Sequence, residues 1–262
     1  EQLQMVNDLV VRQVNGIAVS PSNAAAMASA LAQAKSAGIP VLTWDSDLLP
    51  ENQDLRIAYV GTKNYDIGVN LAKLAQQLKP EGGSICLQSG GAAAANHNER
   101  LQGIRDTLAG ASGSQPPGER LTGQNGWTEV DGCPLYTDDD AARAVQQMED
   151  TLAKNGDLDV FISTGAFTQW NPDAYKSVVD RHKDRVDSKD LVLLVADTLP
   201  VQMDLLKAGY SHGQVGQRPF EMGYKAMFFL ADIIENQKNP DDPTFTGLDV
   251  CTPETADTCI GS

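Results

Sequence analysis

Short apolar segments alternate with longer helical segments along the whole chain, and this order constrains the fold more than any other feature. The segments 16–20, 41–44 and 57–61 have the length and apolar character of strands, and helical stretches separate them. Strands joined through helices run parallel, and a parallel sheet needs helices on both of its faces. We therefore predict an α/β fold built from doubly wound parallel sheets.

The predicted strands fall into two series of unequal length. The first three strands are followed by a second series of five, at 84–90, 127–136, 159–164, 191–197 and 212–217. A Gly-, Pro- and Ser-rich stretch at 110–126 predicts a long exposed loop. The chain opens inside a helix, because apolar residues recur at helical spacing between Leu3 and Val10. Such a helix needs a preceding strand to pack against, so we expect the first lobe to lack one β-α-β unit of about 30 residues.

The formal net charge of −15 at pH 7 makes the chain strongly acidic. Binding to a phosphate backbone requires clustered Lys and Arg, so we expect no nucleic-acid partner. No stretch approaches the roughly 20 consecutive apolar residues of a membrane-spanning helix, so we expect no direct membrane insertion. The residues His97, His182 and His212 are scattered and the cysteines form no CxxC pair, so the sequence predicts no metal and no cofactor.

Four cysteines are candidates for disulfide bonds. Cys251 and Cys259 enclose a short polar segment, CTPETADTC, that a disulfide is able to close. Cys86 lies in one predicted strand and Cys133 in another. An even number of cysteines with this loop spacing favours two disulfides in an oxidising compartment, with their connectivity left open. Four buried thiols in a cytosolic protein are the alternative.

Polar and aromatic residues follow several of the predicted strands. Ligands bind beyond the carboxyl ends of the strands in open parallel sheets, so residues at those positions are candidates for a binding site. They are Trp44, Asp45, Asn98, Arg100, Gly165, Asp197 and Gln217. Such a set suits sugar hydroxyls, because each hydroxyl both donates and accepts, and an indole covers the apolar C–H face of a sugar ring.

Each candidate also has a plain structural alternative. Asp45 and Asp197 are suited to capping the next helix, Arg100 to an exposed helical position, and Trp44 to the core. Their shared position at strand ends favours the binding site. The two aspartates also allow an acid/base pair like that of a glycoside hydrolase. However, the chain has no GxSxG motif, no P-loop and no clear GxGxxG motif, so we expect no enzyme.

Four segments resemble the ribose-type periplasmic sugar-binding proteins of ABC transporters. They are, in this order, GIAVSPSN, IPVLTWDSD, NERLQGI and GQVGQRPFEMGYKA. The resemblance covers nearly the whole chain. It implies the type I periplasmic binding protein fold, in which three crossovers join two Rossmann-like lobes and the ligand lies between the lobes. It also implies that Asp45, Arg100, Asp197 and Gln217 contact the ligand.

The same resemblance implies a domain division and a function. The N-terminal lobe is expected to comprise residues 1–62 and 218–247, and the C-terminal lobe residues 63–217 and 248–262. A periplasmic monomer would capture a small sugar or polyol and deliver it to the membrane permease of an ABC transporter. Ribose-type members usually carry Asn where this chain has Gly165, so one hydrogen bond to the ligand is expected to be absent. A sugar-sensing regulatory or receptor domain of the same fold is the alternative.

Overall fold

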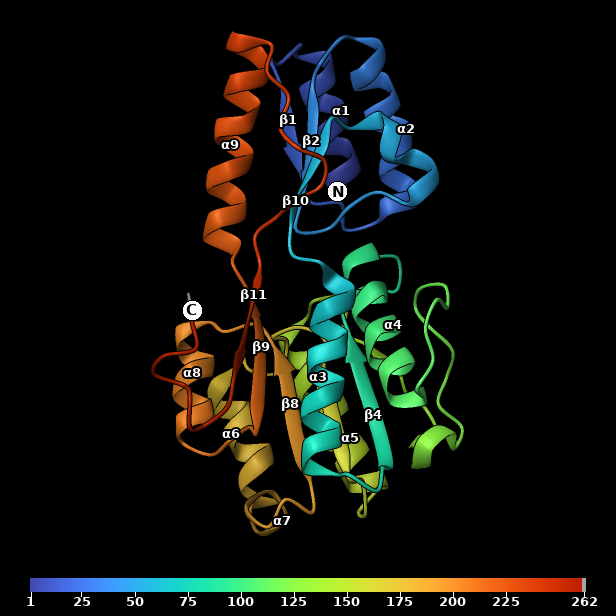
Figure 1. Ribbon diagram of the computed structural model, residues 1–262, viewed down its shortest axis with the longest axis vertical. Coiled ribbons are helices and arrows are strands. Elements are labelled where there is room, and N and C mark those ends of the chain that lie inside the picture. The colour runs from blue at the N-terminus through green and yellow to red at the C-terminus, as the bar shows by residue number, and fades with distance from the viewer. Residues whose placement is uncertain (261–262) are drawn as a thin grey trace. The chain divides into compact units, whose positions relative to one another are not determined.

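The computed structural model describes residues 1–260, which fold into two compact units (Figure 1). Unit 1 comprises Glu1–Lys63, Ala93–Asn96 and Arg218–Gly247. Unit 2 comprises Asn64–Ala92, His97–Gln217 and the residues from Leu248 onward. Each unit has its own mainly parallel sheet and its own hydrophobic core.

Unit 1 contains a four-stranded sheet in the order β1-β2-β3-β10. Its elements are α1 (Gln2–Val11), β1 (Ile17–Val19), α2 (Ala24–Ser36), β2 (Val41–Trp44), the 3-10 helix η1 (Pro50–Leu55), β3 (Ala58–Gly61), α9 (Pro219–Asn236) and β10 (Thr244–Phe245). All three strand pairs are parallel, as the alternation of elements predicts. The two-residue strand β10 was not predicted, because a segment this short has no periodicity.

Helices cover both faces of the sheet in unit 1. Helices α1 and α2 lie on one face, where Leu31 of α2 shares a buried cluster with Ile17 of β1 (Figure 1). Helix α9 lies on the other face, where Leu230 shares a cluster with Leu42 of β2. This two-sided covering leaves the carboxyl ends of the strands as the edge where loops carry polar side chains.

Unit 2 contains a seven-stranded sheet in the order β11-β9-β8-β7-β4-β5, with β6 also paired to β4. Its elements are α3 (Asn64–Leu78), β4 (Gly83–Ser89), α4 (Ala95–Ala109), the 3-10 helix η2 (Gln124–Gly126), β5 (Trp127–Glu129), β6 (Leu135–Tyr136), α5 (Ala141–Lys154), β7 (Val160–Ser163), α6 (Pro172–Asp180), α7 (Lys183–Asp187), β8 (Val192–Ala196), α8 (Pro200–Lys207), β9 (Gly213–Gln217) and β11 (Leu248–Cys251). The first two residues of α4 are counted with unit 1. Strand β11 runs antiparallel to β9, and the other strand pairs are parallel.

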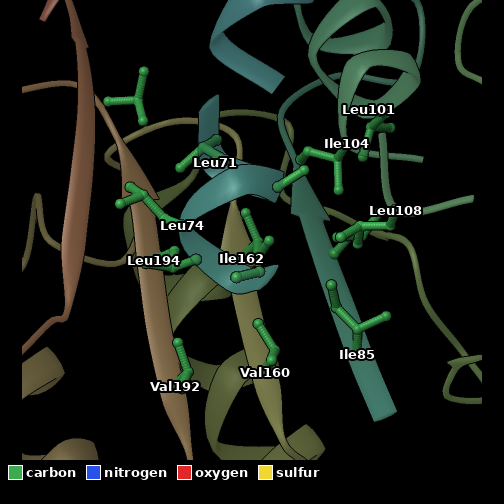
Figure 2. Close-up of a cluster of buried hydrophobic side chains, with 14 of the residues drawn as sticks. Leu71, Leu74, Ile85, Leu101, Ile104, Leu108, Val160, Ile162, Val192 and Leu194 are labelled. Atoms are coloured by element: carbon green, nitrogen blue, oxygen red, sulfur yellow. The ribbon is translucent and has the colours of Figure 1, made fainter. Parts of the chain in front are cut away.

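Buried aliphatic side chains fix α3 and α4 on the sheet of unit 2 (Figure 2). Leu71 of α3 and Leu101 of α4 lie in one cluster with Val160 of β7 and Leu194 of β8, and all four are fully buried. Complete burial of such a side chain stabilises the fold by roughly 1.5–3 kcal/mol. Because Leu101 is anchored in this cluster, the neighbouring Arg100 is held at a defined place on α4.

The strand predicted at 127–136 is wrong in one respect, because the structure divides it into β5 and β6. A turn separates the two pieces. Gly132 has a φ of +94°, and the backbone N–H of Cys133 donates to the carbonyl of Val130 at 3.2 Å. The left-handed conformation at Gly132 turns the chain out of the strand direction.

Two disulfides join all four cysteines, which confirms the prediction of disulfide bonding. Cys86 of β4 is bonded to Cys133, and Cys251 of β11 is bonded to Cys259. The first bond spans 47 residues of sequence and the second only 8. The structure thereby supplies the connectivity that the sequence left open.

Removal of the Cys86–Cys133 disulfide is expected to lower the free energy of unfolding more than removal of Cys251–Cys259. A longer closed loop restricts the unfolded chain more, and separations of 47 and 8 residues correspond to about 4 and about 2.5 kcal/mol. Urea unfolding of the two double Cys→Ala variants, followed by circular dichroism, measures both losses. Equal losses, or a larger loss for the short loop, would contradict this expectation.

Candidate functional site

Two aspartates occupy equivalent positions in the two units. Asp45 follows β2, and its backbone N–H donates to Val60 of the adjacent strand β3 at 3.1 Å. Asp197 follows β8, and its N–H donates to Val215 of the adjacent strand β9 at 2.8 Å. Both have positive φ, +58° and +74°. A non-glycine residue rarely adopts this conformation, and such residues cluster at functional sites.

Neither aspartate caps a helix, so the capping alternative is wrong for both. The N-cap of η1 is Leu49, four residues after Asp45 along the chain. The N-cap of α8 is Leu199, two residues after Asp197. Their unusual backbone is therefore not explained by helix initiation.

Arg100 is a buried hydrogen-bond donor in unit 2, and the alternative of an exposed helical residue is wrong. It is only 1% exposed. Its Nε donates to Oδ1 of Asn64 at 2.9 Å and its Nη1 to the carbonyl of Thr164 at 2.8 Å. Its Nη2 donates to Oε1 of Gln217 at 3.0 Å. A charge this deeply buried is tolerated only when its donors are satisfied, and these bonds fix the guanidinium group in place.

Gln217 links Arg100 to Asp197. While its Oε1 accepts from the guanidinium, its Nε2 donates to Oδ1 of Asp197 at 3.1 Å. The other carboxylate oxygen, Oδ2, accepts from the backbone N–H of Ala166 at 3.1 Å. Three predicted site residues thus form one connected chain, with a cation at one end and a carboxylate at the other. Such a chain offers both donors and acceptors to a polyhydroxylated ligand.

Gly165 lies in the loop that follows β7. This loop contributes backbone groups to the hydrogen-bonded chain of Arg100, Gln217 and Asp197. A Cβ atom at this position would stand 2.5 Å from Cζ of Phe167, so a side chain here would require the ring of Phe167 to move. The residues on either side act through their backbone: the carbonyl of Thr164 accepts from Arg100 and the N–H of Ala166 donates to Asp197. Phe167 was missed by the sequence analysis because it lies four residues beyond the end of β7.

His97 of α4 packs against the same loop. Its Nδ1 lies 3.1 Å from Oγ1 of Thr164, and its ring centroid lies 5.2 Å from that of Phe167. Burial, and secondly the positive charge of Arg100, lower the pKa of His97 well below its usual value. The imidazole is therefore neutral in the folded protein at neutral pH.

We expect His97 to make the protein less stable as the pH falls below about 6.5, the pKa of an unperturbed histidine. Because the folded-state pKa is lowered, only the unfolded chain gains a proton there, at up to about 1.4 kcal/mol per pH unit. Urea unfolding between pH 7 and 5 should show a shallower slope for His97→Gln than for the wild type. His182 and His212 also have lowered pKa values, but they are present in both proteins and cancel in the comparison. Identical slopes would refute this assignment.

Asp45 has polar partners of its own in unit 1. Its Oδ2 accepts from Oγ of Ser20 and from Nδ2 of Asn96, both at 3.2 Å. The hydroxyl of Tyr59 donates to its carbonyl at 2.8 Å. Trp44, the preceding residue, is half-buried rather than enclosed in the core. Ser20 and Asn96 were not among the sequence candidates, although Ser20 directly follows the strand β1.

The structure distributes the seven predicted site residues unevenly. Arg100, Asp197 and Gln217 form one chain in unit 2, with Gly165 beside it, whereas Trp44 and Asp45 lie together in unit 1. The side chain of Asn98 is not part of the hydrogen-bonded chain of Arg100, Gln217 and Asp197. Its Nδ2 donates instead to the carbonyl of Ala92 at 2.9 Å.

Within residues 1–260, no group of three or more His, Cys, Asp or Glu side chains is arranged to hold a metal ion. In the same part of the chain, no helix combines the length and the apolar character needed to cross a membrane.

Residues 1–238 match the family of the periplasmic binding protein domain. The chain belongs to this family. The match confirms the resemblance to periplasmic binding proteins and the predicted type I fold, with its mainly parallel sheets.

Solved structures of other periplasmic binding proteins are similar to this one over almost its whole length. A solute-binding protein of an ABC transporter from Burkholderia graminis, in complex with D-arabinose, is 30% identical, with a TM-score of 0.80 over 98% of this chain and 82% of that chain. A second, from Agrobacterium vitis with bound D-fucose, is 25% identical, with a TM-score of 0.85 over 98% and 81%. A glucose-galactose binding protein from Geobacillus stearothermophilus, at 24% identity, shares the fold with a TM-score of 0.76 over 97% and 82%.

Proposed function

We propose that this periplasmic binding protein captures a small sugar or polyol outside the cytoplasm and delivers it to an ABC importer. The observation that carries the proposal is the hydrogen-bonded chain of Arg100, Gln217 and Asp197 at the carboxyl ends of the strands of unit 2. The relatives from Burkholderia graminis and Agrobacterium vitis, which hold D-arabinose and D-fucose, support a sugar ligand. They give no support to the regulatory alternative.

The chemistry of the proposed site follows from the donors and acceptors of Arg100, Gln217 and Asp197. In this structure Gln217 accepts from Arg100 and donates to Asp197. A sugar hydroxyl is able to accept from the guanidinium and donate to the carboxylate, so it adds bonds of the charge-assisted kind. None of these residues needs to change its protonation state, and the proposed action is binding and release without catalysis.

Asp45 is a further proposed site residue, in unit 1. It shares the strand-end position and the positive φ of Asp197. We propose that the membrane permease recognises the sugar-bound protein, which acts as a monomer.

An extracytoplasmic location is consistent with the covalent structure. Both pairs of cysteines form disulfides, and disulfides persist in oxidising compartments such as the periplasm. These bonds do not support the alternative of four buried thiols in a cytosolic protein.

A panel of pentoses, hexoses, 6-deoxyhexoses and polyols, followed by thermal unfolding, tests the proposed function. A specific ligand at about 100 times its Kd stabilises the folded protein by about 2.7 kcal/mol, which raises the Tm by roughly 5–10 °C for a chain of this size. We expect at least one class of sugar to give such a shift. An unchanged Tm with every compound at millimolar concentration would contradict the proposal.

A further inference from the structure

Gln202, in the first turn of α8, spans the short segment that carries Asp197. Its side chain is fully buried. Its Oε1 accepts from the backbone N–H of Leu199 at 3.0 Å, and its Nε2 donates to the carbonyl of Ala196 at 3.0 Å. Ala196 directly precedes Asp197, and Leu199 follows it by two residues. One amide group therefore binds the backbone on both sides of a proposed site residue.

The backbone that Gln202 spans has a conformation that needs support. Asp197 has a φ of +74°, and a non-glycine residue keeps such a conformation only where the surrounding structure holds it. On the side of the sheet, its N–H donates to the carbonyl of Val215 at 2.8 Å. On the side of α8, the two bonds of Gln202 hold the residues that flank it. The direction of the carboxylate follows from this backbone, so it depends on Gln202.

Two further glutamines complete a buried cluster around Gln202. Its Nε2 lies 3.0 Å from Oε1 of Gln169 and 2.9 Å from Oε1 of Gln214, and both of these residues are fully buried. Gln169 belongs to the loop after β7, and in the same loop the N–H of Ala166 donates to Oδ2 of Asp197 at 3.1 Å. The cluster thus joins the segment that carries the carboxylate to the loop that binds it.

Capping of α8 accounts for only part of these contacts. A Gln at the third position of a helix commonly accepts from the N–H of the N-cap residue, and the bond from Leu199 to Gln202 is of that kind. Capping does not account for the donor side of the amide, which faces the carbonyl of Ala196 and two buried glutamines. A buried amide is costly unless it is hydrogen-bonded, and the bonds that it makes fix the segments that they join.

We propose that Gln202 is a positioning residue for sugar binding, which holds the carboxylate of Asp197 in the orientation that accepts from a sugar hydroxyl. The inference rests on the proposed sugar-binding function. Because Gln202 is fully buried, it acts through Asp197 and not by contact with the sugar. A carboxylate that is held in place before the sugar arrives loses less conformational freedom on binding, and this strengthens the affinity.

A double-mutant cycle measured by isothermal titration calorimetry tests the positioning role. The probe is the compound of the thermal panel that raises the Tm of the wild type most, beginning with D-arabinose and D-fucose. Gln202→Met keeps the length of the side chain but removes the amide, and we expect it to lower the affinity about tenfold. Asp197→Gly removes the carboxylate and adopts the positive φ freely. In that background Gln202→Met should change the affinity less than about twofold, because the group that it positions is absent.

Gln214→Met is the matched control. It disrupts the same buried cluster but leaves the bonds of Gln202 to Ala196 and Leu199 in place. Urea unfolding should show similar losses of stability for Gln214→Met and Gln202→Met, whereas the affinity of Gln214→Met should stay within about twofold of the wild type. Gln202→Asn, which keeps an amide on a side chain one carbon shorter, takes the place of Gln202→Met if the methionine variant does not fold.

Three results would overturn the positioning role and leave sugar binding standing. They are an unchanged affinity in Gln202→Met, an equal loss in the presence and absence of the Asp197 carboxylate, and an equal loss in Gln214→Met. A wild type that binds no compound of the panel would overturn the proposed function together with this inference.

Discussion

Replacing Asp197 with alanine is expected to lower the affinity for the sugar about 30-fold or more, a loss of about 2 kcal/mol. The carboxylate is the anionic end of the hydrogen-bonded chain, and its two oxygens accept from Gln217 and from the N–H of Ala166. Its removal takes away the acceptor for a sugar hydroxyl and leaves both donors without their partner. Isothermal titration calorimetry with a sugar selected by the thermal panel measures the effect.

Two control variants separate the side chain of Asp197 from its backbone. Alanine is strained at a φ of +74°, whereas glycine adopts this conformation freely. Asp197→Gly should therefore lose affinity like the alanine variant but retain more stability. Lys189 is an exposed residue of unit 2 with a φ of +64°, and it lies three residues before the start of β8. Lys189→Ala therefore introduces the same kind of strain at the opposite end of that strand and should leave affinity unchanged. An Asp197→Ala protein that binds the sugar as tightly as the wild type would exclude this residue from the site.

The second large effect is expected on stability, at the ion pair of Arg105 and Glu129. Nε of Arg105 lies 2.7 Å from Oε1 of Glu129, Nη2 lies 2.8 Å from Oε2, and the two side chains are 4% and 0% exposed. Removing Glu129 leaves the buried guanidinium of Arg105 without its carboxylate, although its Nη1 still donates to the carbonyls of Pro117 and Gly118. Glu129→Leu should therefore lower the free energy of unfolding by about 3–5 kcal/mol, measured by urea unfolding.

The design of this experiment includes the removal of both charges. The double variant Arg105→Leu/Glu129→Leu should recover much of the lost stability, because replacement of a buried ion pair by apolar side chains is often close to neutral. As a matched control, the pair of Lys35 and Asp54 lies on the surface, and Lys35→Met should leave the urea midpoint almost unchanged. If Glu129→Leu were no less stable than the double variant, Arg105 and Glu129 would not compensate each other's charge, which would contradict this expectation.

Strand-end positions were predictable from the sequence because they depend on a rule of topology. Once the alternation of helices and strands indicates a parallel sheet, its carboxyl edge is defined, and Asp197 and Gln217 must lie near each other if their strands are adjacent. Strands β8 and β9 are indeed neighbours. For Arg100 the sequence indicated only a candidate. It did not determine whether the helix turns this side chain toward the edge of the sheet or outward.

Other parts of the site depend on tertiary packing and have no local signal. The partner of Arg100 on α3 is Asn64, which is 36 residues away in sequence. The ring of Phe167 fills the space beside Gly165 through a turn in an irregular loop. Asn98 shows the converse, since its place at the start of α4 suggested a site residue while its side chain bonds locally to Ala92. Periodicity locates elements, but it does not specify which side chains meet between them.

The structure of this chain with its tightest-binding sugar, determined by crystallography, tests the central claim most directly. The account predicts sugar hydroxyl oxygens within about 2.7–3.2 Å of Asp197 and Arg100 in unit 2. A sugar bound elsewhere, with neither side chain within hydrogen-bonding distance, would contradict it.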